Sequence, residues 1–125
     1  MKARSTGSAT LMLTLLWWLL IWILSSLPSE DLPSLQVFSI DKLAHIGVYY
    51  ILGLFVDAWL KTRHISPGKR FMIYLILMVS ALLDEYHQTF IPGRSVSIYD
   101  FFANALGLSF AWMTGFFRRD QRSKS

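Results

Sequence analysis

Three groups of ionisable side chains lie at the ends of, or inside, segments of this chain that are apolar enough to cross a lipid bilayer. They occupy residues 41–45 (Asp-Lys-Leu-Ala-His), 84–88 (Asp-Glu-Tyr-His-Gln) and 94–104, which begins with Arg94 and includes Asp100 and Asn104. A charged side chain at the centre of a bilayer costs about 2.5–3.5 kcal/mol on insertion scales. Because the chain keeps so many of them, we expect the three groups to form one shared site.

Residues four apart on a helix share a face, and this spacing recurs within each group. Asp41, His45 and Tyr49 follow one another at intervals of four residues. The corresponding pairs in the other groups are Asp84 with Gln88, Glu85 with Gln88 at a spacing of three, and Asp100 with Asn104. Each group therefore presents its polar side chains in one direction.

Crowded carboxylates in low-dielectric surroundings do not all ionise together, so one can serve as a general acid and another as a general base. The candidate catalytic residues are Glu85, His45, Asp100 and Asp84, with Glu85 as the acid/base residue oriented by His45 or Asp100. Arg94 offers a planar fork that suits a phosphate or carboxylate. The other candidate substrate-binding residues are Gln88, Asn104, Lys42, Asp41 and Tyr49.

A divalent metal is a variant of this site. His45, Glu85 and Asp100 carry ligand atoms of suitable type, but their spacing matches no dedicated metal motif, so neither a metal nor another cofactor is predicted. The chain has no cysteine, which excludes disulfides and thiolate chemistry.

Each polar group also has a structural interpretation. Asp41 and Lys42 are compatible with the interfacial start of a helix, with Asp41 as its N-cap, and Asp100 is compatible with a second cap. His45 alone is compatible with a hydrogen-bonded packing residue. Arg94 is compatible with an anchor that extends toward the lipid–water interface.

The elements that must position these residues are predicted to be transmembrane helices. The chain is 54% hydrophobic and only 16% charged, against about a quarter charged in soluble domains. Four segments have about the 20 residues that a spanning helix needs, at about 9–27, 42–60, 71–91 and 97–117. Pro28 and Pro33, Pro67-Gly68 and Pro92-Gly93 mark the loops. The prediction is an all-α polytopic membrane protein, a four-helix bundle in a single domain of residues 1–125.

The basic residues predict the orientation of the bundle. Two lie at residues 2–4, four at 61–70 and four at 118–125, which makes ten of the twelve Lys and Arg residues. The positive-inside rule makes this side cytoplasmic, with both termini inside and residues 118–125 as a basic tail on anionic lipid. The three polar groups then share the extracytoplasmic side of the cytoplasmic (inner) membrane. Because the positive charge flanks apolar spans, no nucleic-acid partner is predicted.

The polar groups, in this order and spacing, resemble the VanZ-like family over about residues 25–115. The matching pattern is Asp41-Lys42-x-x-His45-x-x-x-Tyr49, then Asp84-Glu85-x-x-Gln88, then Gly93-Arg94-x-x-Ser97-x-x-Asp100-x-x-x-Asn104-x-x-Gly107. The resemblance implies a small multi-pass membrane protein in a cell-envelope setting. The family's namesake is associated with teicoplanin resistance, and the resemblance does not carry that resistance to this chain.

Three hypotheses follow for function. The first is an enzyme that modifies or hydrolyses an anionic, lipid-linked envelope component held in the polar pocket. The second is a non-catalytic protein that binds or senses such a component. The third is a structural network in which the polar residues fix the register of the helices. The sequence leaves the substrate and the oligomeric state open.

Overall fold

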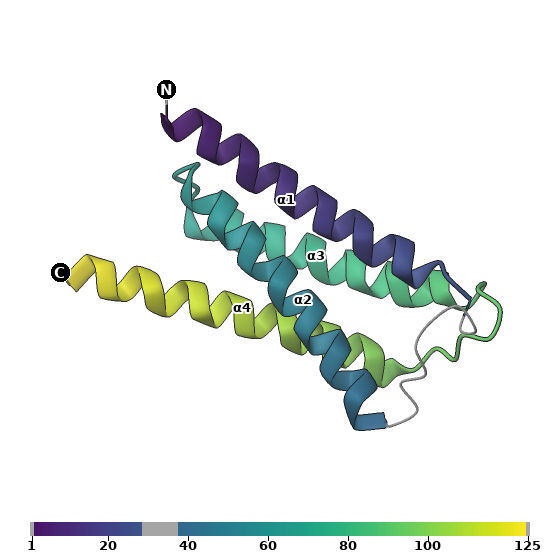
Figure 1. Cartoon of the computed structure of the whole chain (residues 1–125). Helices are drawn as coiled ribbons and strands as arrows, with labels where there is room; N and C mark the ends of the chain where they lie inside the picture. Colours follow the sequence, from purple (N-terminus) through teal and green to yellow (C-terminus); the bar gives the residue numbers. More distant parts are fainter. Residues whose placement is uncertain (1, 29–37, 125) are drawn as a thin grey trace.

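The structure is a computed structural model that describes residues 2–28 and 38–124. Within these residues the ordered elements are four helices: α1 (Lys2–Ser25), α2 (Phe38–Lys61), α3 (Pro67–Gln88) and α4 (Ile98–Lys124). The prediction of an all-α chain with four helices is confirmed for this part of the protein. The beginning of α1 and the end of α4 lie at the same end of the bundle (Figure 1). Pro33 lies outside the described residues.

The helix ends follow local sequence signals, with three differences from expectation. Ser97 caps α4, because its side-chain Oγ accepts a hydrogen bond from the Tyr99 N–H at 3.2 Å. Asp100 therefore lies in the first turn and does not cap the helix. Asp41 likewise lies in the first turn of α2. Pro67 begins α3, so the Pro67-Gly68 pair belongs to the helix and not to the preceding loop, since proline fits the first helical turn.

Close packing of α2 against α4 positions the site. These two helices form the most extensive helix pair, and they cross near the start of α4 (Figure 1). A Cβ atom added at Gly107 would lie 2.3 Å from the backbone oxygen of Ile46, and one added at Gly53 would lie 2.3 Å from the Cβ of Ala111. The small residues on α4 thus let the two backbones approach closely.

Replacing Gly107 with alanine is expected to destabilise the bundle by about 1–3 kcal/mol, because the added methyl group meets backbone and not a movable side chain. The measurement is thermal unfolding of the purified protein in detergent. Gly47→Ala is the matched control, because a Cβ atom at Gly47 meets nothing within 4 Å. Equal melting temperatures for both variants would contradict the close α2–α4 contact.

The polarity of α3 is the reverse of that in a water-soluble protein. Its buried residues are Arg70, Tyr74, Ala81, Asp84, Glu85 and Gln88. Its exposed residues include Phe71, Met72, Leu75, Ile76, Val79, Leu82 and Leu83. Water-soluble proteins rarely expose so continuous an apolar surface or bury so many charged groups. This arrangement fits a helix whose outer face contacts lipid.

By length and composition, two helices in the described part of the chain qualify as membrane spans. The qualifying segments are Thr6–Ser25 in α1 and Ile40–Lys61 in α2. In α3 and α4 the long apolar faces are combined with buried charged residues. These observations indicate a membrane protein.

Candidate functional site

The three polar groups come together at one end of the bundle, around the imidazole of His45. His45 lies on α2 and faces α3 and α4. Its Nδ1 is 2.9 Å from Asn104 Oδ1 and 3.7 Å from Glu85 Oε1. Its Nε2 is 3.7 Å from Asp41 Oδ1 and 3.9 Å from Asp100 Oδ1. Segments separated by about forty residues thus contact the same side chain, which the helical bundle makes possible.

A hydrogen-bond chain on one side of the ring fixes the His45 tautomer. The Asn104 amide nitrogen donates to Glu85 Oε1 at 2.9 Å, so the Asn104 oxygen faces His45. Because that oxygen can only accept, His45 Nδ1 carries the proton and donates it. Glu85 and Asn104 are both buried. The nitrogen that can take up and release a proton is therefore Nε2, on the other side of the ring.

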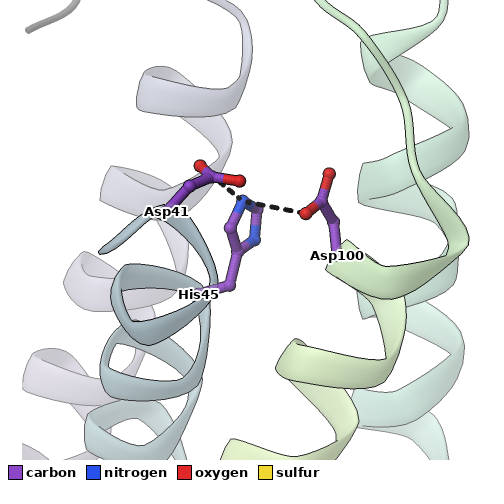
Figure 2. Close-up of side chains that lie close together, drawn as sticks. All are labelled: Asp41, His45 and Asp100. Atoms are coloured by element: carbon purple, nitrogen blue, oxygen red, sulfur yellow. Dashed lines mark ion pairs between the residues drawn. The ribbon is translucent and has the colours of Figure 1, made fainter. Parts of the chain in front are cut away.

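The basic nitrogen lies between two carboxylates. Figure 2 shows Asp41 on the same helix and Asp100 at the start of α4, both directed at His45 Nε2. The Lys42 ammonium donates to Asp41 Oδ2 at 2.7 Å and also to Asp100 Oδ1. One cation thus compensates two carboxylates, which lowers the cost of placing them together in a poorly hydrated site.

A second buried pair extends the site toward the bundle centre. The Tyr49 hydroxyl donates to Asp84 Oδ2 at 3.1 Å, and both side chains are buried. Tyr49 lies one helical turn beyond His45 on the same face of α2. The pair links α2 to α3 next to the His45 network.

A cavity of about 380 Å³ opens beside this network, between α1, α2 and α3. The predicted site residues that line it are Asp41, His45, Tyr49, Asp84, Gln88 and Arg94. The remaining wall includes Ile21 and Leu24 from α1, and Ala44 and Val48 from α2. The cavity therefore has a polar part and an apolar part, and its volume suits a small ligand or part of a larger one.

Four predicted site residues do not line this cavity. They are Glu85 on α3, Asp100 and Asn104 on α4, and Lys42 on α2, and they contact one another or His45. His45 lines the cavity and also contacts Glu85 and Asn104 directly. It therefore connects the cavity wall to these buried residues. His87 lies apart, with its Nε2 3.1 Å from Ser26 Oγ.

Arg94 joins the cavity to α1. Its Nε donates to the Leu27 carbonyl at 3.1 Å and its Nη2 to the Leu24 carbonyl at 2.6 Å. Leu24 lies in the last turn of α1 and its carbonyl also accepts from the Leu27 N–H at 3.3 Å, whereas Leu27 follows the helix, so the guanidinium caps the end of α1. A guanidinium has five N–H donors, which leaves donors that can serve a ligand in the cavity that Arg94 lines.

The residues that could hold a metal differ from those expected. Glu85 lies at Nδ1 of the His45 ring and Asp100 at Nε2, so the set of His45, Glu85 and Asp100 does not surround one point. The ligand atoms of Asp41, His45 and Asp100 do lie within 4.8 Å of one another. Lys42 already donates to both of these carboxylates. The arrangement therefore favours charge compensation by Lys42 over a divalent ion at this position.

A second buried charge cluster, which we did not predict, lies at the opposite end of α2. The carboxylate of Asp57 contacts Lys61 at 2.8 Å, Arg70 at 3.2 Å and Arg119 at 2.8 Å. Gly115 makes room for it, since a Cβ atom there would lie 2.6 Å from Asp57 Oδ1. A signal was available in the sequence, because Asp57 is a lone acid near the end of an apolar span and lies four residues before Lys61.

Both clusters use the same stripe of α2. Asp41, His45, Tyr49, Gly53 and Asp57 follow at intervals of four residues. The Tyr74 hydroxyl donates to the Gly53 carbonyl at 3.0 Å, midway between the clusters. This row winds gradually round the helix axis, and α2 makes polar contacts with its neighbours along most of its length.

Comparison with known proteins gives a match at the level of a protein family. No curated protein and no solved structure matches the chain. A protein-family model described as VanZ/LLP1 matches residues 8–119.

Proposed function

This chain belongs to the VanZ/LLP1 family, and on that premise we propose that it is a polytopic membrane protein that binds an anionic, lipid-linked component of the cell envelope. The cavity at the His45 end of the bundle receives the head group and acts on it by acid–base chemistry. All four helices cross the inner membrane, with both termini in the cytoplasm and this cavity on the extracytoplasmic side.

The exposed surface of the bundle supports four spans. Besides α1 and α2, the outer faces of α3 and α4 are apolar, with Phe102, Leu106, Phe110 and Met113 exposed on α4. Their charged residues face the interior, as charged groups in membranes usually do. The basic clusters at 61–70 and 118–124 lie at the end of the bundle that holds both termini, which supports a cytoplasmic assignment for that end.

Single-cysteine labelling is expected to locate the two ends of the bundle. Because the chain has no cysteine, each introduced thiol reports alone. Ser95→Cys, in the exposed turn before α4, should react with a membrane-impermeant maleimide in intact cells. Ser123→Cys, near the end of α4, should react only after permeabilisation. The reverse pattern would place the cavity on the cytoplasmic side and contradict the proposed topology.

The observation that carries the proposal is the mixed lining of the 380 Å³ cavity. Ile21, Leu24 and Val48 suit the first part of a lipid chain, because removing apolar surface from water lowers the free energy. Arg94 on the same wall suits a phosphate or carboxylate, which a guanidinium binds through charge-assisted hydrogen bonds. A lipid-linked head group has both properties in one molecule.

His45 is the residue best placed to transfer a proton. Its Nε2 is the basic nitrogen, and the ring lines the cavity. In a hydrolysis, His45 Nε2 would accept the proton of the attacking water and later give it to the leaving oxygen, so that the ring returns to its starting state. Glu85 acts through Asn104 to hold the ring in this tautomer, which makes Glu85 a positioning residue instead of the acid/base residue expected from the sequence.

The test uses purified protein in lipid nanodiscs with a long-chain lipid phosphate. The release of inorganic phosphate and the binding of the lipid are measured on the same sample. Phosphate release that His45→Gln lowers supports the enzyme, because His45 is the proposed proton-transfer residue. Binding without release, weakened by Asp100→Asn, supports the alternative of a non-catalytic envelope binder or sensor. Neither binding nor release would contradict both and leave the structural role of the network.

A further inference from the structure

A second cavity lies at the other end of the bundle, away from His45. It has a volume of about 560 Å³ and is lined by Lys61, Arg118, Arg119, Gln121 and Arg122. Its walls come from the end of α2 and the last turns of α4. Four of these five side chains are cations, and none is an acid.

The charges around this cavity do not balance. Lys61 and Arg119 contact the buried Asp57, which also contacts Arg70. The three cations at Asp57 together with Arg118 make four positive charges for one carboxylate. The other nearby acid, Asp120, pairs with Lys124 at 2.7 Å on the exposed side of α4. The cavity therefore has an excess of positive charge, which attracts an anion.

The cavity lies at a boundary between apolar and basic surface. Phe116 and Phe117 are both exposed, and the basic run starts with the next residue, Arg118. On α2, the segment apolar enough to span a membrane ends at Lys61. Two helices thus change from apolar to basic at the level of the cavity, which is the arrangement expected where lipid phosphates meet the protein.

We infer that this cavity binds a phosphate group of an anionic ligand, held by the guanidinium groups of Arg118, Arg119 and Arg122. Arginine suits this role because its planar fork matches the oxygen atoms of a phosphate. The phosphate can belong to an anionic phospholipid such as phosphatidylglycerol or to a free phosphate. The inference does not depend on the function proposed for the cavity beside His45.

The test is native mass spectrometry of the full-length protein from mixed phosphatidylglycerol and phosphatidylcholine, with inorganic phosphate added in a second arm. Wild type is expected to retain phosphatidylglycerol preferentially. The double variant Arg118→Gln/Arg122→Gln should weaken this retention by about thirtyfold, at about 1 kcal/mol per basic residue. If the double variant melts at a lower temperature than wild type, Arg118→Gln alone should still weaken retention by about fivefold.

The matched control is Arg63→Gln/Lys69→Gln, which removes two exposed charges from the same end of the bundle but outside the cavity. It should retain phosphatidylglycerol as wild type does. Displacement by inorganic phosphate would identify free phosphate as the ligand, and no displacement would identify the lipid head group; both support the site. Equal losses in the two double variants, or no preference over phosphatidylcholine, would overturn it.

Discussion

Replacing His45 with glutamine is expected to lower the turnover of a lipid phosphate by about 10²–10⁴-fold, the usual contribution of a positioned acid/base residue. Glutamine can still hydrogen-bond with Asn104, but it has no nitrogen that exchanges a proton near neutral pH. Binding of the lipid should change much less, because Arg94 and the apolar wall remain. The measurement is phosphate release by the purified protein, alongside lipid binding.

The control for this variant is His87→Gln. His87 lies on α3, contacts Ser26 and is absent from the cavity wall. The His87→Gln variant should turn over the lipid at the wild-type rate. Equal turnover by His45→Gln and wild type would remove His45 from the chemistry, whereas equal losses in both histidine variants would indicate an effect on folding.

Replacing Asp57 with asparagine is expected to destabilise the protein by about 3–5 kcal/mol, the usual effect of removing one partner from a buried ion pair. Arg70 is itself buried, so it would keep its charge without the carboxylate that compensates it. The cluster also ties α2 to α3 and α4 at this end of the bundle. The measurement is thermal or denaturant unfolding in detergent.

Asp120→Asn provides a matched loss of charge. Asp120 pairs with Lys124 on the exposed side of α4, where ion pairs contribute little to stability. The Asp120→Asn variant should have a melting temperature close to that of the wild type. A melting temperature for Asp57→Asn that equals that of Asp120→Asn would show that the buried cluster does not stabilise the bundle.

The positions of the polar residues along the chain predicted their meeting, but not their separate roles. Helical spacing placed Asp41, His45 and Tyr49 on one face, and the structure keeps them there. Spacing could not say whether Glu85 or His45 faces the cavity, because that depends on how α2 rotates against α3 and α4. The rotation is fixed by close contacts such as Gly107 with Ile46, which involve backbone atoms.

Two further features of the site could not be predicted from the pattern of polar residues. Part of the apolar wall of the cavity comes from α1, where Ile21 and Leu24 are ordinary residues of an apolar span and carry no signal of their own. The Arg94 contacts with the Leu24 and Leu27 carbonyls involve backbone groups, which side-chain patterns do not encode. The carboxylate of Asp57, by contrast, was visible as a lone acid in its span.

The single polar stripe of α2 constrains how that helix can move. A turn of α2 about its own axis would carry His45 away from Asn104 and, at the same time, carry Asp57 away from Arg119. Contacts at both ends of α2 therefore oppose rotation of the helix, so a force that turns one end is resisted at the other. Sliding or tilting of α1, which contributes apolar wall to the cavity beside His45, leaves these two contacts of α2 intact.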